Sequence, residues 1–153
     1  MSPENEVTRE IAATPAEVFA AITDITRMGE WSPETHAAEW NDGCDGPAVG
    51  AVFTGHNSNA GNEWSTEAVI VELVENERFF FDCRVGDFVF STWGYVIEPT
   101  EGGCRVTEYS ENLIPEEMRA ASAGISGVED RQTHNRATME VTLDRLAAAL
   151  EQR

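Results

Sequence analysis

Three side chains in this chain of 153 residues are candidates for moving protons, namely Glu108, Tyr95 and His56. Glu108 alternates with Val106 along a strand-like run, so we expect both to face the protein interior. A carboxyl group that faces an apolar interior has a raised pKa or a specific partner, and it could serve as a general acid or base. The alternative is structural: Glu108 would lie near the end of its strand, paired with an arginine or in contact with water.

Tyr95 lies on a second strand-like run, where alternation places it on the same face as Trp93 and Ile97. A tyrosine hydroxyl or an indole N–H needs a hydrogen-bond partner when it is buried, and a ligand could provide one. Among the three histidines, His56 is the one expected to approach the mouth of a cavity. The pattern therefore predicts Tyr95, Glu108 and His56 as candidate proton-transfer groups.

Other side chains could line an apolar cavity, although packing in an ordinary core is the simpler interpretation of any single aromatic residue. Gln132 and Asn135 interrupt the apolar stripe of the last predicted helix, and polar groups there need a strand carbonyl, a water molecule or a ligand as partner. Alternatively, the first turns of this helix overhang the sheet. The complete predicted ligand-binding set is Trp31, Phe53, Trp64, Phe81, Trp93, Tyr95, Glu108, Gln132, Asn135 and Met139.

Motifs for nucleophilic, nucleotide-dependent and metal-dependent chemistry do not occur in the sequence. Gly-x-Ser-x-Gly and Gly-x-Gly-x-x-Gly are both missing. There is no His-x-x-x-His motif, and the three cysteines, Cys44, Cys83 and Cys104, have unrelated spacings. We therefore expect no metal, no cofactor and three free thiols.

The composition restricts the partners of the chain. Ten arginines, with no lysine, stand against 28 acidic residues, which gives a formal net charge of −18. Such a charge repels phosphate backbones and anionic lipid headgroups, so we expect neither a nucleic acid nor a membrane as a partner. The N-terminus shows no secretory signal, and no apolar run approaches the roughly 20 residues of a membrane-spanning helix. These features predict a cytoplasmic protein.

Hydrophobic periodicity and turn residues predict a strand, two short helices, six strands and a helical tail, in that order. The first strand covers 6–12. A capping box of Thr14 and Glu17, with Pro15 at the first helical position, begins the first helix, and Asp24 caps a second short turn. Six strand-like runs, separated by Gly, Asp and Asn, follow at 36–41, 50–57, 63–74, 78–85, 88–98 and 104–111.

The tail is predicted to be helical again. A short helix begins at Pro115. A second capping box, Ser126 with Glu129, then begins a long amphipathic helix over 128–150. On this helix His134 lies about 150° from the centre of the apolar stripe, so we expect it to face solvent.

These elements favour one α+β domain that spans 1–153. A single long helix can bury its apolar stripe, which includes Met139 and Leu143, only against the concave face of a strongly curved sheet. The sheet would be antiparallel and seven-stranded, with the two short helices between its first two strands. A sheet wrapped around one helix seldom fills its own interior, and such a gap commonly serves as a ligand cavity.

Several segments resemble the START-related (SRPBCC) polyketide cyclase/dehydrase and lipid-transport superfamily over roughly residues 5–150. The resemblance implies the helix-grip fold and the binding of a sterol, lipid, hormone or polyketide. Some members are cyclases or dehydratases, and no catalytic motif is shared by all members. The segments that carry the resemblance are 14–19 (TPAEVF), 30–33 (EWSP), 49–57 (VGAVFTGHN), 64–66 (WST), 93–99 (WGYVIEP) and 102–108 (GGCRVTE).

Three functions remain open at this point. The first is a binding or carrier protein, monomeric or homodimeric, for a small hydrophobic molecule. The second is a cyclase, aromatase or dehydratase that acts on a polyketide-like substrate, with Tyr95, Glu108 or His56 moving protons. The third is an interaction module that uses the acidic outer sheet, with only a vestigial cavity.

Overall fold

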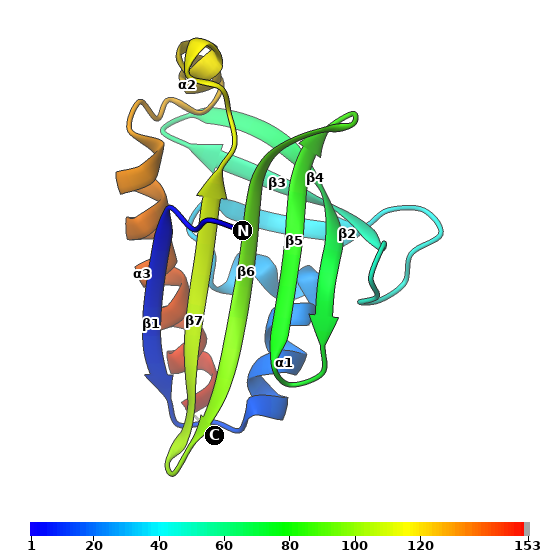
Figure 1. Ribbon diagram of the computed structural model, residues 1–153, viewed down its shortest axis with the longest axis vertical. Helices are drawn as coiled ribbons and strands as arrows, with labels where there is room; N and C mark the ends of the chain where they lie inside the picture. Colours follow the sequence, from blue (N-terminus) through cyan, green and yellow to red (C-terminus); the bar gives the residue numbers. More distant parts are fainter. Residues whose placement is uncertain (152–153) are drawn as a thin grey trace.

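In the computed structural model, which describes residues 1–151, an antiparallel seven-stranded sheet curls around a long C-terminal helix (Figure 1). The spatial order of the strands is β1-β7-β6-β5-β4-β3-β2, so only β1 and β7 pair across a long stretch of sequence. The α+β helix-grip architecture expected from the sequence is confirmed. The strands are β1 (Asn5–Ile11), β2 (Thr35–Trp40), β3 (Val52–Asn59), β4 (Asn62–Val74), β5 (Arg78–Val85), β6 (Phe88–Thr100) and β7 (Gly103–Asn112).

Two short helices lie between β1 and β2, as predicted. The Thr14 side chain accepts a hydrogen bond from the Glu17 backbone N–H at 3.1 Å, and the Glu17 carboxylate accepts one from the Thr14 N–H at 3.0 Å. This reciprocal pair is the predicted capping box. The Asp24 side chain caps the second helix by accepting a hydrogen bond from Thr26 N–H. The helices of the chain are α1 (Pro15–Thr23), the 3₁₀ helices η1 (Ile25–Glu30) and η2 (Glu116–Met118), α2 (Arg119–Ser126) and α3 (Arg131–Glu151).

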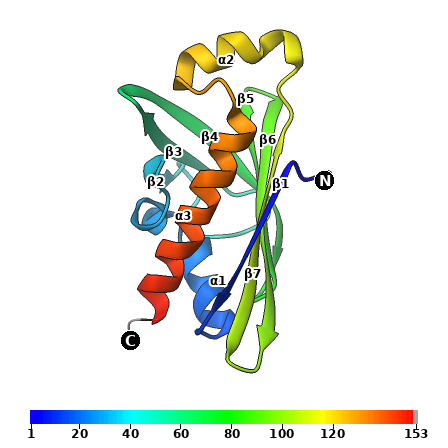
Figure 2. The ribbon, with the colours of Figure 1, turned by 90° about the vertical axis from the view of Figure 1, so that its left-hand side faces the viewer.

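Helix α3 lies along the concave side of the sheet, close to the edge formed by β1 and β7 (Figure 2). Met139 and Leu143 on its inner face are buried, as predicted. The lower part of the concave face is filled by α1, α3 and large apolar side chains such as Phe79 and Ile70. At the upper end α2 crosses beyond the strands, and the space below it is not filled by a helix (Figure 1). None of the described helices is both long and apolar enough to cross a membrane.

The predicted start of the long helix was wrong by three residues. Ser126 ends α2 instead of beginning α3, because Gly127 adopts a left-handed conformation with φ of 75° and stops the helix there. The N-terminus of α3 is held by Asp130, whose carboxylate accepts hydrogen bonds from Thr133 N–H at 3.1 Å and Thr133 Oγ1 at 2.8 Å. The pair Ser126 and Glu129 has the spacing of a capping box but does not form one.

Candidate ligand-binding cavity

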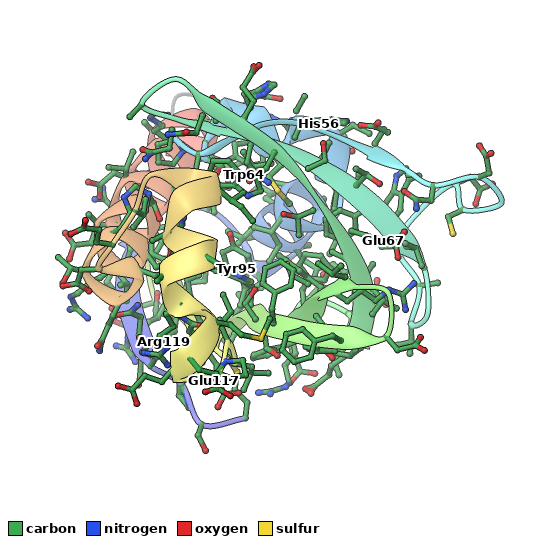
Figure 3. All side chains as sticks on the ribbon, turned by 90° about the horizontal axis from the view of Figure 1, so that it is seen from above. His56, Trp64, Glu67, Tyr95, Glu117 and Arg119 are labelled. Carbon is green, nitrogen blue, oxygen red and sulfur yellow. The ribbon has the colours of Figure 1, made fainter. Side chains whose placement is uncertain are left out.

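A cavity of about 580 Å³ lies between the concave sheet, α3 and α2. Side chains from every strand except β1 line it, and α2 contributes one side of its upper end. Figure 3 looks down from above past α2, and Tyr95 lies between α2 and the strands. A volume of this size is within the range of about 300–1,000 Å³ that holds most small-molecule ligands.

Alternate residues of each strand face inward, and most of the side chains that line the cavity in this way are apolar. On β5 these are Phe81, Cys83 and Val85. Phe53 on β3 packs edge-on against Phe81, with 5.2 Å between the ring centroids. Burial raises the pKa of the Cys83 thiol to about 12, so Cys83 is an apolar wall residue at neutral pH.

The lower end of the cavity, which we call the floor, carries a buried carboxyl group. Glu108 on β7 is 5% exposed and is paired in register with Tyr95 on β6. Burial raises the pKa of Glu108 to about 8, an effect opposed only in part by a hydrogen bond from the Tyr95 hydroxyl. Burial and the neighbouring Glu108 carboxyl raise the pKa of Tyr95 well above its usual value. At neutral pH both side chains are therefore predominantly uncharged.

One oxygen of Glu108 has no hydrogen-bond partner. Among the residues that the structure describes, Glu108 Oε1 is the single fully buried side-chain nitrogen or oxygen atom that lacks a hydrogen-bond partner. A buried polar atom without a partner costs about 1–3 kcal/mol, so such an atom in a cavity wall requires a physical explanation. A ligand group that reaches the floor would supply the missing partner.

Several other polar side chains of the cavity wall form hydrogen bonds within the chain itself. Thr142 Oγ1 donates to the Thr138 carbonyl at 2.7 Å, and Thr138 Oγ1 donates to the Asn135 carbonyl at 2.9 Å. Asn57 is held by two side-chain hydrogen bonds, from Thr35 Oγ1 at 2.6 Å and to Thr66 Oγ1 at 3.0 Å. These residues therefore add little unmet hydrogen-bonding capacity to the walls.

The upper wall contains a network of charged side chains that the sequence did not reveal. Glu34 accepts hydrogen bonds from Arg131 Nη1 at 2.9 and 3.0 Å and from His134 Nε2 at 2.7 Å. Arg131 also donates to Asn135 Oδ1 at 3.2 Å and lies over the Trp64 ring at 6.0 Å. Glu34 is thus a second carboxylate in the cavity wall, but it is paired with the guanidinium group of Arg131.

This network also corrects the prediction for His134. The side chain is half-buried against Glu34 and does not project freely into solvent. The helical wheel placed His134 away from the sheet, but it did not include the segment before β2, which packs against this side of α3. The prediction failed because it considered only one neighbour of the helix.

Large apolar side chains remain exposed at the upper end of the cavity, which we call the rim. Val85 and Phe88 belong to the β5–β6 hairpin and are 72% and 44% exposed. Met118 and Ile125, on the segment η2–α2, are also exposed, and all four side chains line the cavity. The side chain of Asn59 donates to the Ser126 carbonyl at 2.9 Å and ties the end of α2 to the β3–β4 hairpin.

Most of the predicted ligand-binding residues are brought together at this cavity, although their role in binding remains a prediction. The exception in this set is Gln132, which is exposed and donates to the backbone carbonyl of Glu4 at 3.3 Å. Its partner is thus a backbone carbonyl next to the start of β1, one of the partners considered for a polar group at this position, and not a group in the cavity. The cavity-lining members are Trp31, Phe53, Trp64, Phe81, Trp93, Tyr95, Glu108, Asn135 and Met139.

His56 lies outside the cavity, which corrects its prediction as a proton-transfer group. It points from β3 to the outer face of the sheet (Figure 3), where its ring contacts Ser65 Oγ at 3.0 Å and the Glu39 carboxylate at 2.8 Å. Phe53 faces inward on the same strand, and two residues an odd number of positions apart point to opposite faces. This signal was present in the sequence.

Sequence reasoning missed the lining residues from α2, Glu34 before β2 and several wall residues on the strands, among them Phe90 on β6. The pairing of β5 with β6 shifts register between Cys83 and Arg84, where the partners change from Ser91 to Val89. This bulge turns Phe90 as well as Ser91 toward the cavity, which strict alternation does not predict. No local sequence signal marks the bulge.

Within residues 1–151 no group of three His, Cys, Asp or Glu side chains could hold a metal ion. Cys44, Cys83 and Cys104 are all free thiols. The floor pair of Glu108 and Tyr95 offers a proton donor and acceptor in an apolar enclosure, and the walls offer a surface for an apolar molecule.

Comparisons with known proteins agree with this geometry. The model of the family described as "Polyketide cyclase / dehydrase and lipid transport" matches residues 3–151. A polyketide cyclase-like protein of Corynebacterium glutamicum is 32% identical, with a TM-score of 0.63, over 96% of this chain and 90% of that chain. No curated protein sequence matches the chain.

Two further solved structures share the fold at lower identity. A protein from Nitrosomonas europaea is 17% identical, with a TM-score of 0.71, over 99% of this chain and 97% of that chain. A di-domain ARO/CYC protein from the steffimycin biosynthetic pathway is 14% identical, with a TM-score of 0.72. The match to this protein covers 97% of this chain and 50% of that chain, which has two domains.

Proposed function

The chain belongs to the polyketide cyclase/dehydrase and lipid transport family, and on this premise we propose that it is a binding or carrier protein for a small hydrophobic molecule. The ligand would be lipid-, sterol- or polyketide-like and would lie in the cavity between the sheet and α3. The observation that carries this proposal is the cavity of about 580 Å³ with its aromatic walls and apolar rim. An empty apolar space of this size lowers the stability of a fold, and a bound apolar ligand would offset that cost.

Binding can be tested with N-phenylnaphthylamine, an apolar dye whose emission rises and shifts to the blue in an apolar site. We expect saturable binding to the protein. Replacement of Thr142, which lines the floor, by Phe fills the cavity and should weaken binding at least tenfold. Val141→Phe is the matched control, because Val141 lies next to Thr142 on α3 but is exposed.

The outcome separates a ligand cavity from an ordinary packing defect. Both variants are first checked for folding by circular dichroism and thermal melting. Absence of saturable binding to the original protein would overturn the proposal, and so would equal affinity of the folded Thr142→Phe and Val141→Phe variants. If the dye binds as expected, native mass spectrometry of the purified protein would identify a co-purified ligand directly.

A second candidate is a cyclase, aromatase or dehydratase that uses the same cavity. The observation that favours it is the buried Glu108 beside Tyr95, because a carboxyl group with a pKa near 8 is suited to proton transfer around neutral pH. The test is ring closure of a linear poly-β-ketone, followed by absorbance. Loss of turnover in Glu108→Gln with dye binding retained would support an enzyme, and absence of turnover above the uncatalysed rate would exclude this substrate class.

The third hypothesis, an interaction module with a vestigial cavity, does not fit the structure. That hypothesis combined an acidic outer sheet facing a basic partner with only a vestigial cavity, and the observed cavity is large enough for a ligand of ordinary size. The acidic outer surface accounts for the charge without a partner, since many of the acidic residues are exposed.

A further inference from the structure

We propose that the ligand carries a neutral oxygen at its leading end, as in a ketone or an alcohol, and that this end enters first and accepts a hydrogen bond from Glu108 on the floor. The inference rests on the proposed binding function and specifies the chemical class of the ligand and its orientation. The rest of the molecule would lie along the apolar walls, with its far end at the rim.

The depth of the floor determines this orientation. Tyr95 and Glu108 are the lowest cavity-lining residues on β6 and β7, whereas Phe88, at the other end of β6, is exposed at the rim. Phe88 and Tyr95 are seven positions apart, which corresponds to about 23 Å at a rise of about 3.3 Å per residue. A ligand that satisfies Glu108 must therefore be elongated, with its polar group at the end remote from the rim.

The number of polar groups on the ligand follows from what the floor leaves unsatisfied. Thr142, Thr138 and Asn57 already form hydrogen bonds within the chain. The Tyr95 hydroxyl opposes the rise in the pKa of the Glu108 carboxyl, and Glu108 Oε1 has no hydrogen-bond partner within the described chain. One hydrogen-bond acceptor on the ligand is therefore sufficient, and a second acceptor this deep in the cavity would lose its hydration without finding a free donor.

The charge of that group follows from the cations available. Arg131 is the one cationic residue among the described cavity-lining residues, and it is bound to Glu34. It lies eleven residues before Thr142 on α3, about 16 Å along the helix axis at about 1.5 Å per residue. A ligand carboxylate at the floor would thus have no counter-ion. A ligand ammonium would require an ionised Glu108, and a buried ion pair repays its desolvation poorly.

Glu108 is the hydrogen-bond donor in this arrangement because its pKa of about 8 keeps the carboxyl group protonated at neutral pH. The titratable groups that share the cavity with it are Tyr95 on β6, Cys83 on β5, and Glu34 and Arg131 at the upper end. Burial raises the pKa of both Tyr95 and Cys83, so neither ionises near pH 8. Affinity for a ketone should therefore fall as the pH rises through about 8, when Glu108 loses the proton that it donates.

The experiment uses four naphthalenes with the same hexyl tail, whose opposite end carries an acetyl, isopropyl, carboxylate or aminomethyl group. Each competes with N-phenylnaphthylamine for the intact protein. The acetyl compound should bind about tenfold more tightly than its isopropyl isostere at about pH 6, the effect of one buried hydrogen bond. This preference should be lost at about pH 9.5, where Glu108 is ionised.

Two variants assign the effect to Glu108. Glu108→Leu has no donor and should abolish the preference for the acetyl compound while it still binds the isopropyl compound. Glu108→Gln keeps an N–H donor that does not titrate, so its preference should persist from about pH 6 to about pH 9.5. If Glu108→Leu does not fold, the pH profiles of Glu108→Gln and of the original protein decide the question.

The result distinguishes this inference from the function on which it rests. If none of the four compounds displaces the dye, the proposed binding function fails. If the compounds bind but the acetyl and isopropyl forms are equal, or the carboxylate or amine binds best, only the assigned ligand class and orientation are wrong. A preference that persists at about pH 9.5 in the original protein would show that Glu108 is not the donor.

Discussion

The buried carboxyl of Glu108 should make the stability of the fold depend on pH in a characteristic way. In the unfolded chain its pKa is near the ordinary value of 4.5, and in the folded protein it is about 8. Between these values the folded state retains a proton that the unfolded chain has lost. The associated stabilisation is therefore fully present below about pH 4.5, falls as the pH rises, and is lost above about pH 8.

The magnitude follows from the size of the pKa shift. At about 1.4 kcal/mol per pKa unit, the rise from 4.5 to about 8 corresponds to about 5 kcal/mol, of which about 3 kcal/mol is lost by pH 7. A domain of this size has a total stability of about 5–15 kcal/mol, so the effect is large enough to measure. Glu108→Gln removes the titrating group and keeps nearly the same shape, so the effect should be absent from the variant.

The assay is urea unfolding followed by tryptophan fluorescence at several pH values from about 4.5 to about 9. The informative quantity is the difference in unfolding free energy between the original protein and Glu108→Gln, because the other acidic groups contribute equally to both. This difference should change by about 5 kcal/mol across the range. Glu98→Gln, at an exposed glutamate on β6, is the matched control for removal of one surface carboxylate from the same strand pair. A difference for Glu108→Gln that does not change with pH would refute the assignment of a buried, protonated Glu108.

Two further predictions concern packing away from the floor. Leu143→Ala should lower the unfolding free energy, measured in urea, by about 2–5 kcal/mol, because Leu143 is fully buried on α3. Val141→Ala, at an exposed position of the same helix, should have little effect. Equal effects of the two variants would contradict the observed orientation of α3. Gly94→Ala should lower the unfolding free energy by about 1–3 kcal/mol, because a Cβ at this position would lie 1.9 Å from the Phe80 ring on the outer face. No change in the same assay would show that the Phe80 ring is free to move.

The sheet could be predicted from the sequence because its signals are local. Each predicted strand overlaps an observed one, with ends that differ by at most two residues. Turn residues mark the hairpins: Gly61 and Gly86, which follow β3 and β5, have φ of 87° and 59°, a conformation that favours glycine. Inward and outward positions followed from alternation, which placed Tyr95 and Glu108 on the buried face correctly.

Features that depend on tertiary neighbours could not be predicted in this way. The segment 126–130 contains two possible helix caps, Ser126 with Glu129 and Asp130 alone, and only the left-handed Gly127 between α2 and α3 decides between them. The bulge on β6 shifts Phe90 into the cavity without a local signal. The hydrogen bonds of Glu34 with Arg131 and His134 join segments about a hundred residues apart, which no spacing rule relates.

The physical state of Glu108 bears on the choice between a carrier and an enzyme. A proton shuttle needs a second group that accepts the proton and returns it within each turnover. Tyr95 is the neighbour of Glu108 at the floor, and the raised pKa of its hydroxyl prevents it from acting as a base near neutral pH. His56, the other candidate, lies on the outer face, bound to Glu39 and Ser65. Glu108 would thus have to exchange its proton with the substrate alone, whereas a single donor is all that a bound ketone or alcohol requires, so the arrangement favours recognition over turnover.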